Sequence, residues 1–189
     1  MRWTQAMMRE VAKEERTDVG LDEFQALDPR QIAAAHGIPI YALSQLADSG
    51  AKLEAVEHFG KKTSSSWSAA LVPLGSARII IENDSHLPVR RRSNIAHELG
   101  HHLLEHVFKT VILGEDHKRQ FSPEQEKQAT FMAGELLIPL PAVERMAFAG
   151  WSNEQVANAF DVSEQFAQMQ MYGQRVRAER AAKKFSSRR

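Results

Sequence analysis

Two histidines and a glutamate lie together in the short run His97-Glu98-Leu99-Gly100-His101. Side chains four residues apart on a helix lie one turn apart on the same face, so both imidazoles could bind one zinc ion at about 2.0–2.1 Å. The carboxylate of Glu98 lies beside that face, where it could take a proton from an attacking water molecule as general base. The spacing therefore favours a metal-dependent hydrolase.

A third metal ligand is expected from a second helix. Glu126 follows His101 by 25 residues, in the first turn of a segment with a capping box of Ser122 and Gln125 and with Pro123 at its first position. Three protein ligands would leave a fourth position open, which is typical of a catalytic zinc site. Other possible ligands lie in a predicted loop: Glu115, Asp116 and His117.

The rest of the motif helix carries further signals. Gly100 costs about 1 kcal/mol relative to alanine inside a helix, so its presence predicts that another group approaches the backbone there. His102 and His106 are expected on the same helix but on other faces, at the surface or behind the ligands. Donors for the oxyanion of a reaction intermediate are not singled out, and the choice stays open among Tyr41, Tyr172, His86, His106, His117 and the run 90–92.

Hydrophobic periodicity and turn residues predict the elements that must position these groups. Strands are expected over 38–41, 67–72 and 77–81. Helices are expected over 29–36, 42–59, 123–137 and 153–160. Three more are expected: one from a cap at Ser93 or Asn94 to about Lys109, one from Pro141 to about Gly150, and one from Ser163 onward. The pattern is typical of an α+β fold that is mainly helical, with a small antiparallel or mixed sheet beside the motif helix.

Composition limits the chemistry further. The 189 residues include no cysteine, which excludes disulfides, thiolate ligands and cysteine nucleophiles, so a zinc site here must use histidines and carboxylates. No apolar run is long enough to cross a bilayer, and charged residues interrupt the first fifteen positions, where a signal peptide would need an apolar stretch. We therefore expect a cytoplasmic protein with no membrane partner.

Three runs together resemble the ImmA/IrrE family of zinc metallopeptidases: Arg91–Leu104, Glu126–Thr130 and Ala133–Pro139. The resemblance covers roughly residues 67–162, about half of the chain. It implies a zincin-like fold, zinc ligands at His97, His101 and Glu126, and a general base at Glu98. Two positions depart from the family pattern, with Thr130 in place of asparagine and Met132 in place of phenylalanine.

The resemblance also narrows the function. It implies a cytoplasmic zinc endopeptidase that makes a limited cut in a protein substrate, a transcriptional repressor of the helix-turn-helix (Xre) type, and so derepresses genes. By analogy with other zincins, the strand over 77–81 would lie along the cleft and pair with an extended substrate.

The chain divides into an N-terminal helical region packed on the peptidase (1–60), a peptidase core (61–172) and a basic C-terminal helix or tail (173–189).

Two other functions stay open. Residues 153–172 have the spacing of a helix-turn-helix, and the tail that follows carries seven basic residues against one acidic residue, which favours a DNA-binding regulator. However, the second helix of this segment has no Arg or Lys before Arg175, so we do not expect direct nucleic-acid binding. The other alternative is a catalytically silent zincin-fold protein that acts by binding a partner. The sequence does not indicate an oligomeric state.

Overall fold

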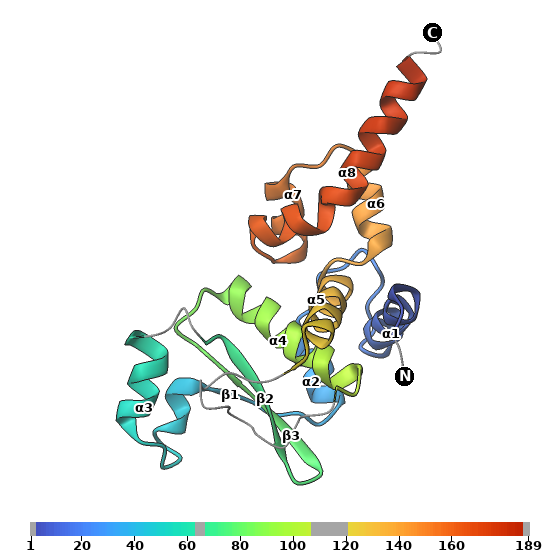
Figure 1. Ribbon diagram of the computed structural model, residues 1–189. Helices are drawn as coiled ribbons and strands as arrows, with labels where there is room; N and C mark the ends of the chain where they lie inside the picture. Colours follow the sequence, from blue (N-terminus) through green and yellow to red (C-terminus); the bar gives the residue numbers. More distant parts are fainter. Residues whose placement is uncertain (1–2, 63–66, 107–120, 187–189) are drawn as a thin grey trace.

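The computed structural model describes residues 3–62, 67–106 and 121–186 (Figure 1). Within these ranges, the chain forms eight α-helices and one three-stranded sheet. The strands are β1 (Ile40–Ala42), β2 (Ala69–Leu74) and β3 (Ala77–Glu82). The helices are α1 (Gln5–Asp18), α2 (Pro29–Ala35), α3 (Leu53–Glu57), α4 (Pro88–Leu103), α5 (Pro123–Leu137), α6 (Leu140–Phe148), α7 (Asn153–Phe160) and α8 (Glu164–Ser186). The predicted α+β class with a small mixed sheet is confirmed.

The sheet has the order β1-β3-β2. Strand β3 pairs with β2 in an antiparallel hairpin whose turn contains Gly75 at a φ of 62°, and with β1 in parallel. The expectation that the strand over 77–81 offers its edge to a substrate fails at Ile80 and Ile81, because β3 there has β1 on one side and β2 on the other. Among the described strands, β2 lies at the edge nearest the motif helix.

Helix α4, which contains the motif, lies between the sheet and α5 (Figure 1). Its apolar side chains Ile95 and Leu99 are completely buried, together with Leu71 of β2 and Ile80 of β3. Helix α1 lies in the expected N-terminal helical region, although its limits were not predicted, and it packs against α5. The buried Arg16 of α1 donates to the carbonyl oxygen of Leu136 (2.5 Å), at the C-terminal end of α5.

Two predicted helices have the wrong limits. Helix α4 begins at Pro88, because proline suits the first position of a helix, and Ser93 is not a cap but donates to the carbonyl oxygen of Arg90 within the helix. The predicted end near Lys109 lies outside the described residues, but α4 already ends at Leu103.

The predicted helix over 42–59 is divided into a 3-10 helix (Leu43–Leu46), α3 and a π-helical turn (His58–Lys62). Gly50, at a φ of 92°, takes a conformation that no α-helix contains.

Helices α6, α7 and α8 share a second apolar core with the end of α5. Val156 and Phe160 of α7 pack there with Ala167 and Met171 of α8. The last turns of α8 extend beyond the other elements (Figure 1). In the described part of the chain, no helix is both long and apolar enough to span a membrane.

Candidate metal centre

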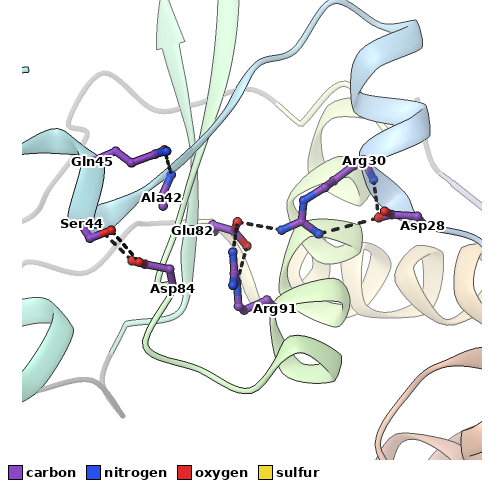
Figure 2. Close-up of polar contacts among 8 residues, drawn as sticks. All are labelled: Asp28, Arg30, Ala42, Ser44, Gln45, Glu82, Asp84 and Arg91. Atoms are coloured by element: carbon purple, nitrogen blue, oxygen red, sulfur yellow. Dashed lines mark hydrogen bonds and ion pairs between the residues drawn. The ribbon is translucent and has the colours of Figure 1, made fainter.

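The first turn of α4 is tied to the end of β3 by a buried carboxylate. Glu82, 4% exposed, accepts from Arg91 of α4 (Oε1 2.6 Å, Oε2 3.1 Å) and from Arg30 of α2 (2.7 Å), as Figure 2 shows. Burial alone would raise the pKa of Glu82, but the hydrogen bonds from Arg91 and Arg30 outweigh it and lower the pKa. This ion-pair network fixes how the motif helix leaves the sheet.

The other two arginines of the run 90–92 also contact the scaffold. Arg92 donates to the carbonyl oxygen of Leu27 (2.6 Å) and forms an ion pair with Asp161 (3.1 Å). Arg90 donates to the hydroxyl of Ser68 (3.1 Å). These contacts, about two turns before the motif histidines, give the run a structural role.

Helices α4 and α5 approach each other closely at Gly100. A Cβ atom at this position would lie 2.8 Å from the carbonyl oxygen of Ala129 and 3.0 Å from its Cα. The predicted close approach is thus confirmed, and the partner is the backbone of α5. The contact brings the first turn of α5, with Glu126, opposite the histidine face of α4.

Three side chains converge at this crossing. His97 Nε2 lies 3.1 Å from His101 Nε2 and 3.2 Å from Glu126 Oε2, and His101 Nε2 lies 3.6 Å from Glu126 Oε1. Ligands at 2.0–2.1 Å from a tetrahedral zinc ion are about 3.3 Å apart, so these atoms fit the corners of one coordination shell. The cluster of His97, His101 and Glu126 could therefore hold a metal ion.

The cluster is buried on one side and open on the other. The side chain of His101 is 1% exposed, that of His97 is 27% exposed and that of Glu126 is 46% exposed. The neighbouring imidazoles of His101 and His97 hold the pKa of the Glu126 carboxyl well below its usual range, although burial opposes them. The carboxylate is therefore ionised at neutral pH, as a metal ligand must be.

Glu98, next to His97 on α4, reaches the edge of the sheet. It is 6% exposed, and its Oε2 accepts from the backbone N–H of Leu71 in β2 (2.8 Å). Leu71 of β2 lies opposite Ile80 of β3. The N–H of Ile80 donates to the carbonyl oxygen of Pro39, on the side of β3 away from β2, so these two residues form a pair whose N–H groups point outward. The N–H of Leu71 therefore points away from β3 and toward α4. A strand edge thus orients the carboxylate predicted to act as base.

A further histidine lies directly behind the cluster. His106 Nδ1 is 2.9 Å from His101 Nδ1, and His106 Nε2 is 3.0 Å from Gln128 Oε1. Burial lowers the pKa of His106, although the bond to Gln128 opposes the shift. The ring of Phe121 stacks on that of His101, with centroids 3.8 Å apart. His106 was expected behind the ligands, but it follows α4 instead of lying on it, and no local signal indicated Gln128 or Phe121.

His102 lies away from the cluster. Its Nε2 is 3.2 Å from Nδ1 of His36, and burial, with His36 and Arg78, lowers its pKa to about 4. The two departures from the family pattern lie on α5, where Thr130 is exposed and Met132 is fully buried. The alternative ligands Glu115, Asp116 and His117 lie outside the described residues.

The model of the peptidase M78 family, described as an IrrE N-terminal-like domain, matches residues 33–172. The chain belongs to the peptidase M78 family. The match begins in α2, ends in α8 and includes the whole histidine and carboxylate cluster. Membership confirms the resemblance to the ImmA/IrrE family and the zincin-like fold, and it implies a metallopeptidase. A search among curated proteins finds no match.

The helix-turn-helix-like segment of this M78 protein forms as α7, a tight turn and the start of α8. The turn needs no glycine, because Asp161 itself takes the left-handed conformation (φ 52°). The apolar face of the segment lies in the second core, and its exposed residues in the first turns of α8 include Glu164, Gln165 and Gln168, none of them basic. The segment thus packs into the second core, and its exposed face offers few contacts for DNA phosphates.

Proposed function

We propose that this M78 protein is a zinc-dependent endopeptidase with His97, His101 and Glu126 as metal ligands and Glu98 as general base. One observation carries the proposal: three ligand atoms 3.1–3.6 Å apart lie beside a buried carboxylate on the same helix. Two neutral imidazoles and one carboxylate are a donor set that zinc prefers, and it leaves a position for water or substrate.

Zinc, when bound, would polarise the scissile carbonyl and make a water molecule more acidic. The chain supplies the proton transfers. The carboxylate of Glu98 takes a proton from the attacking water and then gives it to the leaving amine. The N–H of Leu71 holds one oxygen of Glu98 at 2.8 Å, which keeps the carboxylate in place for both transfers. Glu126 contributes a negative charge that compensates part of the charge of the ion.

The substrate we propose is a helix-turn-helix (Xre-type) transcriptional repressor in the cytoplasm, cut at a limited number of bonds so that its target genes are derepressed. The support is the family: the chain resembles ImmA/IrrE peptidases in three separate runs, and the M78 model covers the site. A DNA-binding role for the chain itself has less support, because the exposed start of α8 offers no basic side chains.

The test is cleavage of a helix-turn-helix repressor encoded beside this chain, in the presence of zinc. The wild type should yield a few discrete fragments, identified by mass spectrometry. Glu98→Gln keeps the size of the side chain but cannot accept a proton, so we expect zinc binding to persist and cleavage to fall by about 10²–10⁴-fold. Cleavage by Glu98→Gln at the wild-type rate would show that Glu98 is not the base.

The matched control is Glu144→Gln. Glu144 is a partly exposed glutamate of α6 whose one described ion pair, with Arg177, is 3.5 Å long. This variant should cleave at the wild-type rate. Binding of the repressor by both wild type and Glu98→Gln without any cleavage would favour the silent interaction protein instead.

A further inference from the structure

The chain folds back on the metal cluster where α4 ends. Glu105 takes a left-handed conformation (φ 51°), its N–H donates to the carbonyl of His102, and the N–H of His106 donates to the carbonyl of His101 (3.0 Å each). These bonds form a Schellman motif, in which glycine usually occupies the position of Glu105 because the left-handed region costs other residues about 1–2 kcal/mol. The turn carries His106 back over His101.

The pair of side chains that meets in this motif is unusual. An apolar contact commonly accompanies the turn, but here two imidazoles meet, with their Nδ1 atoms 2.9 Å apart. His101 is 1% exposed and His106 is 4% exposed. Two ring nitrogens at this distance need one proton between them, so one ring must donate and the other must accept.

Helix α5 determines the direction of that bond. The carboxylate of Glu124 can only accept, so the amide nitrogen of Gln128 faces it (3.4 Å) and the amide oxygen faces His106 Nε2 (3.0 Å). An amide oxygen also only accepts, and His106 therefore carries its proton on Nε2 and accepts at Nδ1. The proton between the rings then belongs to His101 Nδ1.

This chain of donors leaves the lone pair of His101 on Nε2, the atom 3.1 Å from His97 Nε2 and 3.6 Å from the Glu126 carboxylate. An imidazole binds a metal only through a nitrogen without a proton. We propose that His106, held by Gln128, is a positioning residue that keeps His101 in its metal-binding tautomer. The inference rests on the proposed function, because it concerns the same metal site.

The first test compares two substitutions of His106. His106→Asn keeps an acceptor near the position of Nδ1, whereas His106→Leu fills the space without one. Loss of the hydrogen-bond partner of a metal-ligating histidine lowers metal affinity about 10–100-fold. In a zinc titration against a chromophoric chelator, we expect this loss for His106→Leu and a change of only a few fold for His106→Asn. His102→Leu, which removes the neighbouring imidazole that contacts His36, is the control and should bind zinc normally.

The second test reads the tautomer in the zinc-free protein. Ring ¹⁵N chemical shifts should show the proton of His101 on Nδ1 in the wild type and in His106→Asn, and a substantial fraction on Nε2 in His106→Leu. Thermal unfolding of the zinc-free variants establishes that each is folded. A purely space-filling role for His106 would lower the melting temperature without moving these ring shifts.

The third test is a double-mutant cycle. Gln128→Leu should weaken zinc binding by itself, but it should add little to His106→Leu because the two residues act as one chain. Wild-type affinity in His106→Leu, or additive costs in the double variant, would overturn the inference alone. Failure of the wild type to bind zinc would overturn the proposed function, and this inference with it.

Discussion

Gly100 of α4 faces the backbone of Ala129 in α5, and a methyl group at position 100 would lie 2.8 Å from the Ala129 carbonyl oxygen. This contact sets the distance between the helix that carries His97 and His101 and the helix that carries Glu126. The metal cluster therefore depends on a residue that has no side chain.

Gly100→Ala should destabilise the fold despite the better helix propensity of alanine. The methyl group must push α5 away, and overpacking of this kind costs about 1–3 kcal/mol. We expect a lower free energy of unfolding in urea and weaker zinc binding as Glu126 moves out. The matched control is Gly173→Ala on the exposed face of α8, where a Cβ meets nothing within 4 Å and alanine should stabilise by up to about 1 kcal/mol. Equal effects of the two substitutions would contradict the role of the helix contact.

Glu82→Gln tests the ion-pair network behind α4. The change should cost about 1–3 kcal/mol, because Arg91 and Arg30, which stay 27% and 38% exposed, lose a charged hydrogen-bond partner. The pKa of Glu82 is lowered in the folded protein, so the unfolded chain binds more protons in acid. The stabilisation should be fully present above the usual pKa of 4.5 and decline as the pH falls below it.

Urea unfolding of the Glu82→Gln variant at a series of pH values measures both effects. The variant should be less stable than the wild type at pH 7, and the difference should narrow in acid. Glu144→Gln, which removes a surface partner of Arg177, should cost less than about 1 kcal/mol at any pH. A pH-independent difference for Glu82→Gln would mean that the network does not hold Glu82 ionised.

Glu105→Gly should stabilise the protein by about 0.5–1 kcal/mol. The left-handed φ of 51° is unfavourable for glutamate and free of strain for glycine, whose greater flexibility in the unfolded chain cancels part of the gain. Asp161→Gly, at a φ of 52°, should gain less because it also loses the ion pair with Arg92. Thermal unfolding of both variants checks the order, and a loss of stability in Glu105→Gly would contradict the assigned turn.

Removal of the chain after residue 178 tests the basic tail. Helix α8 keeps Arg175, which donates to Asn153 and to the carbonyl oxygen of Trp151 (2.9 Å), while most of the basic residues are lost. We expect cleavage of an isolated repressor to continue, with at most a slower association. Assays with and without operator DNA, at two salt concentrations, show whether the tail contributes to cleavage only when the repressor is bound to DNA. Loss of cleavage only in the presence of operator would mean that the tail recruits the enzyme to DNA-bound repressor.

Local signals predicted the elements whose ends are set by neighbouring residues. Ser122 and Gln125 form the expected capping box of α5, and Ser152 does the same for α7 with Gln155. The end of α4 escaped prediction, because Glu105 occupies a position where glycine would have been the signal. The central place of β3 also escaped, since it depends on pairing with β1, about forty residues earlier in the chain.

The candidate site also combines residues that local patterns predict with partners that they do not. The histidine pair and Glu98 follow from helical spacing, which is a local property. The partners of these residues come from elsewhere: Leu71 lies 27 residues before Glu98 and Gln128 lies 22 residues after His106. Contacts of this kind depend on how α4, α5 and β2 pack, and no periodicity in the sequence encodes them directly.

The most direct test of the account is the zinc content of the purified protein. Protein prepared without chelator, supplied with zinc and then freed of excess metal should contain about one zinc ion per chain by elemental analysis. His97→Ala should contain little, and Glu126→Gln should bind more weakly while it keeps the wild-type circular dichroism spectrum. A wild-type protein that contains no zinc after this treatment would contradict the account.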